Sequence, residues 1–143
     1  MKNYVLAICL LLFIPCVCFS QGTVYSLAID RGHSGDVYTS TYLGGFWKGD
    51  ENLSSWQERN NGLSSRQPVH SFTILCAAMA PSNGNILYVG TTEGVYRSIN
   101  GGQTWADTEF TDDSVTNLSF GRTTSSIYIG TIHNDIIKRD LYH

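Results

Sequence analysis

The sequence has little cysteine outside its first 20 residues. Three of the four cysteines, Cys9, Cys16 and Cys18, lie in that segment, and only Cys76 follows it. A single cysteine cannot form an internal disulfide, so the fold has to be held together by packing. Cys76 lies within an apolar stretch, where we expect a free cysteine to behave as a small buried hydrophobe rather than as a reactive thiol.

The sequence also lacks any block of basic residues. It contains 9 Lys and Arg against 12 Asp and Glu, which gives a net charge of −3. Lys2 is the one charged residue among the first 20, so the rest of the chain has 8 basic and 12 acidic residues and a net charge of −4. This balance argues against nucleic acid or an anionic membrane surface as a partner.

No apolar run is long enough for an ordinary transmembrane helix. The longest, residues 5–14, follows Lys2 and ends at Pro15. Small residues at Cys18 and Ser20 then precede Gln21, which is typical of a cleaved secretory signal peptide. We expect residues 1–20 to be the signal peptide and the protein to be secreted or periplasmic. A lipid anchor on a cysteine of this segment is a weaker alternative, because the residues before those cysteines are not small.

The remaining chain contains an internal repeat. Trp56 and Trp105 lie 49 positions apart, each nine residues after an aromatic residue, Trp47 or Tyr96. Strand-like segments rich in β-branched and aromatic residues recur in the same order and are separated by Gly and short polar turns. The first strands of the three units are residues 24–29, 74–79 and 115–120, and the second strands are residues 37–41, 87–91 and 127–131. The pattern predicts an all-β fold of tandem four-stranded antiparallel units, the third of which stops after its third strand.

The most informative segment is residues 98–105, which follows the third strand of the second unit. Asn is favoured where a tight turn begins, because its side chain can accept a backbone N–H two residues on. The two glycines supply the positive φ angles that a hairpin turn requires, and the Trp ring can cover the hairpin. We therefore expect a structural role in the hairpin for Ser98, Asn100, Gly101, Gly102, Thr104 and Trp105.

Residues 98–105, together with residues 81–84 and 87–91, resemble a BNR repeat, also called an Asp-box. This segment has Asn100 where the box usually has Asp. Similar repeats occur in sialidases, xyloglucan-active glycoside hydrolases, sortilin-type receptors and photosystem assembly factors. The resemblance implies a β-propeller with about 2.75 blades, at about residues 23–63, 71–111 and 114–141. Propellers usually close with about four to eight blades, so we expect self-association, a partner that supplies further blades, or a chain that is part of a longer propeller.

One edge of these units collects the candidate binding residues. Because the strands alternate in direction, the turns between second and third strands share an edge with the connections between units. The connection from Trp56 to Ile74 is longer than its counterpart and is a loop where repeat proteins often bind ligands. The candidate binding residues on this edge are Arg66, His70, Glu93, His133 and Asp135. The alternative is that they are solvated loop residues.

The chemistry of these candidates remains open. Glu93 and Asp135 could form the carboxylate pair of a glycosidase, whereas His70 and His133 lack a recognisable metal-ligand spacing. The sequence shows no nucleophile motif and no phosphate-binding loop, so we predict no metal site and no cofactor. The best interpretation is an exported, non-enzymatic binding or assembly module whose ligand is carbohydrate or protein. The alternatives are part of a glycoside hydrolase propeller and a gene fragment without independent function.

Overall fold

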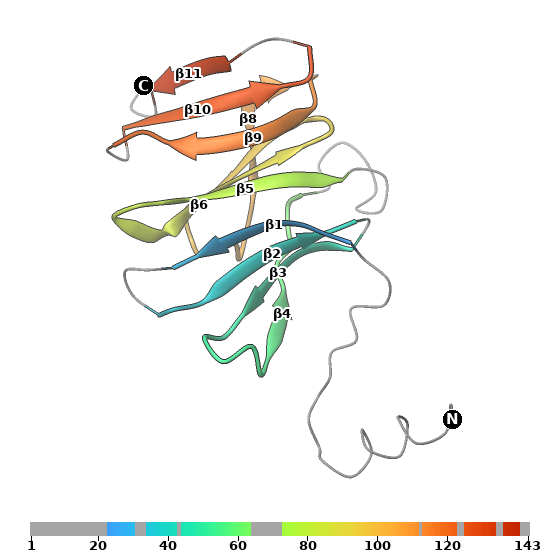
Figure 1. Ribbon diagram of the computed structural model, residues 1–143, viewed down its shortest axis with the longest axis vertical. Helices are drawn as coiled ribbons and strands as arrows, with labels where there is room; N and C mark the ends of the chain where they lie inside the picture. Colours follow the sequence, from blue (N-terminus) through green and yellow to red (C-terminus); the bar gives the residue numbers. More distant parts are fainter. Residues whose placement is uncertain are drawn as a thin grey trace.

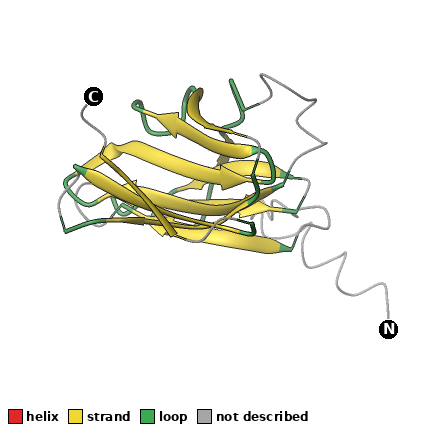
Figure 2. Ribbon diagram, turned by 90° about the horizontal axis from the view of Figure 1, so that it is seen from above, coloured by secondary structure: helices red, strands yellow, loops and turns green. Residues whose placement is uncertain are grey.

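The computed structural model describes residues 23–30, 34–42, 44–63, 73–111, 113–122, 125–133 and 136–140 (Figure 1). The predicted signal peptide, residues 1–20, lies outside this part of the chain. Every described element is a strand or a loop, and no helix occurs among these residues (Figure 2). The strands are β1 (Val24–Ile29), β2 (Val37–Thr41), β3 (Gly45–Gly49), β4 (Trp56–Glu58), β5 (Ile74–Ala80), β6 (Asn83–Thr91), β7 (Gly94–Ser98), β8 (Ala106–Thr111), β9 (Val115–Phe120), β10 (Ser126–Thr131) and β11 (Ile136–Asp140).

The strands form three antiparallel sheets in chain order. Blade 1 has the order β1-β2-β3-β4 and blade 2 the order β5-β6-β7-β8. The third sheet has the order β11-β10-β9 within the described residues. Each strand pairs with the next in sequence because short polar turns join them. The predicted all-β architecture of tandem antiparallel units is therefore confirmed.

Alternation of side chains along each strand places one blade against the next. Successive side chains of a strand point to opposite faces of its sheet. In β6, Leu87 and Val89 pack toward blade 1, whereas Tyr88 packs toward the third sheet. Blade 2 is apolar on both faces for this reason, and the sheets stack along the chain (Figure 1).

The first strands of the three sheets lie side by side. β5 contacts both β1 and β9, so the three form the inner edges of their sheets (Figure 1). A hollow of about 440 Å³ runs along them and is lined by both apolar and polar groups, among them Leu27, Asp30, Met79 and Phe120.

Two hydrophobic clusters hold the sheets together. The cluster between blades 1 and 2 contains Ala28, Tyr38, Phe46, Leu63, Ile74, Leu87, Val89, Tyr96 and Trp105. The cluster between blade 2 and the third sheet contains Tyr88, Val95, Val115, Ile127 and Ile129. Cys76 packs against the second cluster, and its thiol donates to the backbone oxygen of Val115 at 3.5 Å. Burial raises the pKa of this thiol to about 12, so it stays protonated at neutral pH, as expected for a structural cysteine.

Candidate functional site

The antiparallel order gives the molecule two loop-bearing edges. One carries the turns between first and second strands and those between third and fourth strands; we call it the hairpin edge. The other carries the turns between second and third strands and the connections between sheets; we call it the turn edge. The sequence analysis placed the candidate binding residues on the turn edge.

The hairpin of residues 98–105 is held by side-chain hydrogen bonds. The Ser98 hydroxyl accepts the backbone N–H of Asn100 at 3.3 Å and that of Gly102 at 2.9 Å. The Asn100 side chain accepts the Thr104 N–H at 2.9 Å through Oδ1 and donates to the Thr104 hydroxyl at 2.8 Å. The expectation that Asn100 accepts an N–H two residues on is therefore wrong: Ser98 accepts the N–H two residues on, whereas Asn100 reaches four residues on. Gly101 and Gly102 have φ angles of 66° and 77°.

Trp105 joins this hairpin to blade 1. Its indole N–H donates to the backbone oxygen of Arg59 at 2.8 Å. Its backbone N–H donates to the backbone oxygen of Asn61 at 2.9 Å. The ring meets Phe46 edge-on, with centroids 5.2 Å apart, and the residue is only 6% exposed. An amphipathic ring with a satisfied N–H is well suited to such a buried position.

Blade 1 has a hairpin of similar design around Asp50. Its carboxylate accepts the Ser54 N–H at 2.8 Å and the hydroxyls of Ser54 and Ser55 at 2.7 and 2.6 Å. These hydrogen bonds, with that from Ser55 the strongest, hold the pKa of Asp50 well below its usual value. Asp50 and Asn100 each cap a backbone N–H four residues on, which is a correspondence that the sequence analysis missed.

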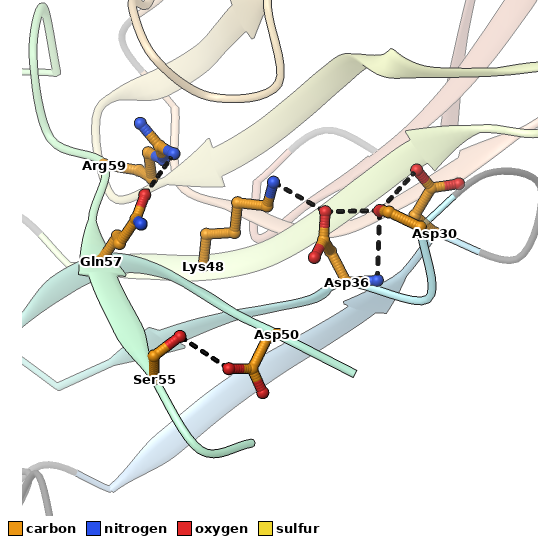
Figure 3. Close-up of polar contacts among 8 residues, drawn as sticks. Asp30, Asp36, Lys48, Asp50, Ser55, Gln57 and Arg59 are labelled. Carbon is orange, nitrogen blue, oxygen red and sulfur yellow. Dashed lines mark hydrogen bonds and ion pairs between the residues drawn. The ribbon is translucent and has the colours of Figure 1, made fainter. Parts of the chain in front are cut away.

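A polar cleft of about 280 Å³ opens on the hairpin edge between blades 1 and 2. It is formed where the loop between β1 and β2 meets the start of β6 and the 98–105 hairpin of blade 2. The side chains along it are largely charged, amide or hydroxyl groups, and Figure 3 labels Asp30, Asp36, Lys48 and Arg59 among them. The lining residues are Asp30, Ser34, Asp36, Tyr38, Lys48, Arg59, Asn83, Gly84, Asn85, Asn100, Gly101 and Gln103.

The charged groups of this polar cleft are arranged as a short network. The Lys48 ammonium lies 2.6 Å from a carboxylate oxygen of Asp36 and 5.8 Å from the centroid of the Tyr38 ring. The Ser34 hydroxyl donates to Asp36 and, at 3.4 Å, to the buried carboxylate of Asp30. Burial alone would raise the pKa of Asp36, but the hydrogen bonds from Lys48 and Ser34 outweigh it and hold that pKa below its usual value. Asp36 is therefore ionised at neutral pH.

Arg59 adds a second cation to the wall of the polar cleft. Its guanidinium donates to the Gln57 side chain at 2.7 Å. The Nε atom is buried and has no hydrogen-bond partner within the described part of the chain. A buried N–H of this kind is a donor available for an additional acceptor.

Of the candidate binding residues predicted on the turn edge, Glu93 and His133 belong to the described residues. Arg66, His70 and Asp135 lie outside the described residues. Glu93 and His133 occupy equivalent turns in blade 2 and the third sheet, and Ser114 connects these turns: its hydroxyl donates to the Thr92 oxygen at 3.0 Å, and its backbone oxygen accepts the Ile132 N–H at 3.0 Å.

His133 contacts Asp113 on this edge. Its exposed ring lies 3.0 Å from a carboxylate oxygen of the buried Asp113, measured from Nδ1. Within the residues that the structure describes, no group of three or more His, Cys, Asp and Glu side chains is placed to hold a metal ion. That part of the chain also has no helix that is long and apolar enough to cross a membrane.

The polar cleft was not found from the sequence, although a signal for it was present. The first loop between first and second strands runs from Asp30 to Asp36, whereas its counterpart in blade 2 is the tight turn at residues 81–82. A loop that departs from the repeat is a place to look for binding. From the sequence, the connection after Trp56 was the loop predicted to bind on this ground.

Comparison with known proteins supports the fold but not a family. No protein-family model matches the chain, and no curated protein matches it. Among solved structures, the chain is similar to an ancestral GH74 enzyme, with a TM-score of 0.66 and 25% sequence identity. The match covers 77% of this chain and 14% of the enzyme, so the chain spans a small part of that protein's length. With the sheet order described above, this similarity confirms the predicted propeller-blade architecture.

Proposed function

We propose that this chain is an exported propeller module that binds a hydroxyl-rich ligand, such as a carbohydrate, without catalysing its hydrolysis. The observation that carries the proposal is the polar cleft between blades 1 and 2. Cations from Lys48 and Arg59 and amides from Asn85 and Gln103 line it together. Amide, carboxylate and guanidinium groups are the donors and acceptors that match hydroxyl groups.

The ionised state of Asp36 in the polar cleft favours hydrogen bonding to a ligand over acid catalysis by this residue. A glycosidase needs one carboxyl group with a raised pKa to protonate the leaving oxygen. The pKa of Asp36 is instead held low by Lys48 and Ser34. Asp36 therefore accepts hydrogen bonds at neutral pH but does not act as a general acid.

The turn edge is the second candidate surface. Glu93 and His133 lie in turns connected through Ser114, and the proposal extends to Arg66, His70 and Asp135 from the adjoining segments. The second candidate function, part of a glycoside hydrolase propeller, is favoured by the similarity to a GH74 enzyme. It would place the carboxylates of Glu93 and Asp135 on this edge.

A glycan array probed with the full chain would test the binding proposal. We expect Lys48→Met combined with Gln103→Ala to abolish binding, because both side chains line the polar cleft. The matched control is Arg66→Ala combined with Glu93→Gln on the turn edge, which we expect to bind as the wild type does. Loss of binding in the control, with retention in the first pair, would assign the ligand to the turn edge instead.

A panel of aryl-glycosides and sialosides would test the absence of hydrolysis. Turnover that is abolished by Glu93→Gln or Asp135→Asn would overturn the non-catalytic proposal in favour of a glycoside hydrolase.

The proposed export has a separate test: mass analysis of the secreted protein should show Gln21 as the first residue. Secreted material that retains Met1 would contradict the proposed cleavage.

A further inference from the structure

The spaces between neighbouring sheets differ at their outer ends. Between blades 1 and 2, the Trp105 ring fills the space beside Phe46 and Leu63. Between blade 2 and the third sheet, a hollow of about 660 Å³ occupies the corresponding place. Its walls come from β6, β7 and β8 on one side and from β10 and β11 on the other.

Strand register shows that the walls of this hollow match the walls around Trp105. Lys48 pairs with Gln57 in blade 1, and Arg97 pairs with Ala106 in blade 2. Lys48 and Arg97 are equivalent because each lies 5.8 Å over the ring of its cross-strand tyrosine. Ala106 therefore corresponds to Gln57.

The same register identifies a hydrogen-bond acceptor in the hollow. Two residues beyond Gln57 is Arg59, whose backbone oxygen accepts the indole N–H of Trp105. Two residues beyond Ala106 is Thr108, which lines the hollow together with Phe110. The backbone oxygen of Thr108 thus stands where a second indole would donate its N–H.

The edge of β11 is the other half of this site. β11 corresponds to β7, whose outer neighbour is the fourth strand β8, but β11 pairs only with β10 among the described residues. Lys138, Arg139 and Asp140 lie on this edge and line the hollow, and the Lys138 ammonium lies 3.8 Å from an Asp140 carboxylate oxygen. A strand edge of this kind is a template for an additional strand.

We propose that the hollow and the β11 edge together bind a tryptophan-bearing β-strand from a second polypeptide. The strand pairs antiparallel with β11, its tryptophan fills the hollow, and the indole N–H donates to the Thr108 backbone oxygen. Trp47, Trp56 and Trp105 lie elsewhere in the fold: the Trp47 indole donates to the backbone oxygen of Gly44 at 2.7 Å, Trp56 packs against Gly49, and Trp105 lies between blades 1 and 2. This site is independent of the polar cleft and of its proposed ligand.

The chemistry of the bound strand follows from the segment that occupies the equivalent place. Residues 98–111 supply the hairpin, the tryptophan and the fourth strand of blade 2. A synthetic peptide of residues 98–111 is therefore a suitable probe.

Fluorescence anisotropy of this labelled peptide with the full-chain protein tests the proposal. We expect saturable binding that weakens by about tenfold or more when the peptide carries Trp105→Ala, since each tenfold in affinity corresponds to about 1.4 kcal/mol. In the protein, Ala106→Trp places a ring in the hollow and should abolish binding. Gln57→Trp, at the equivalent position of blade 1, is the matched control and should leave binding unchanged.

Several results would overturn the proposal. One is equal affinity of the wild-type protein for the wild-type and Trp105→Ala peptides. This comparison needs no protein variant, so it is valid even if a protein variant fails to fold. Another is unchanged binding to the Ala106→Trp protein with its circular dichroism preserved. The absence of saturable binding would also count against it.

Discussion

The two interfaces between sheets are built from the same repeat, yet one is closed and the other is open. Tyr38, Phe46 and Lys48 of blade 1 face blade 2, and the Trp105 hairpin closes over them. Tyr88 and Val95 of blade 2 face the third sheet in the same way, but a hollow lies beside them. The difference shows that strand pattern alone stacks the sheets, whereas a tight interface also requires an aromatic residue from the hairpin.

The third sheet extends this comparison by one step. Tyr128 and Ile136 are the equivalents of Tyr38 and Phe46, and they are 40% and 77% exposed. In blades 1 and 2 the same positions are buried against the next sheet. The third sheet therefore presents an interface of the repeat without a covering sheet among the described residues. A further blade, whether from self-association, from a partner or from a longer propeller, would pack on this face.

The largest effect is expected from removing Trp105. Trp105→Ala deletes the ring that packs on Phe46 and its hydrogen bond to Arg59, and should lower the free energy of unfolding by about 3–5 kcal/mol. Phe110→Ala, beside the open hollow, is the comparison and should cost less because its site is already partly empty. Denaturant melts measure both. An unchanged midpoint for Trp105→Ala would show that the closed interface does not depend on this ring.

Gly62 gives a sharper test of the same interface. Its φ angle is 91°, and a Cβ atom there would lie 2.2 Å from the backbone oxygen of Trp105. We expect Gly62→Ala to cost about 2–3 kcal/mol, since it combines an unfavourable φ with a clash against backbone. Gly101→Ala measures the cost of the unfavourable φ alone, because its φ is 66° and a Cβ atom there would lie 3.5 Å from its nearest neighbour, the Tyr38 hydroxyl oxygen. This substitution should cost about 1–2 kcal/mol. Equal losses would mean that contact with Trp105 adds nothing.

The hairpin that carries Trp105 depends on Asn100 to a smaller degree. Asn100→Ala removes the acceptor of the Thr104 N–H and should cost about 0.5–1.5 kcal/mol. Asn100→Asp keeps that acceptor, and the Thr104 hydroxyl can turn to donate to the carboxylate, so its stability should match the wild type. Thermal melts distinguish the two. A loss in the Asp variant as large as in the Ala variant would show that the amide N–H is the essential group.

The fold was predictable from the sequence because its signals are local. β-Branched and aromatic residues at 24–29, 74–79 and 115–120 form first strands as expected, and the shared spacing of Trp56 and Trp105 identified the repeat. These signals depend on alternation and turn chemistry within one unit. They are therefore visible without knowledge of how the units pack.

The polar cleft was not predictable in the same way because it joins residues from two blades. Asp36 and Lys48 are brought together by pairing of β2 with β3, and Gln103 reaches them only when blade 2 packs on blade 1. The pairing of donors and acceptors within the 98–105 hairpin was also missed, because Ser98 and Asn100 are both able to accept a backbone N–H. Residue type alone does not say which of them takes which donor.

The smallest effect is expected from removing ion pairs, one in blade 1 and one in the third sheet. Asp36 and Lys48 are partly buried and 2.6 Å apart, whereas Lys138 and Asp140 are exposed and 3.8 Å apart. Because hydrogen bonds outweigh desolvation and lower the pKa of Asp36, its contribution to stability is present above the unfolded pKa, near about 4, and is lost as the pH falls through the folded pKa.

Asp36→Asn should therefore lower stability at neutral pH by up to about 1 kcal/mol, and the difference from the wild type should vanish in strong acid. The pKa of Lys48 is raised above its usual value, because its hydrogen bond to Asp36 outweighs desolvation. The wild-type protein should therefore also lose this stabilisation at high pH, as the pH rises through the pKa of Lys48. Lys138→Met is the control and should change nothing measurable, because exposed pairs contribute little. Urea melts across pH provide the measurement. A difference that persists at low pH would mean that Asp36 acts through its shape and its hydrogen bonds to Ser34 rather than through its charge.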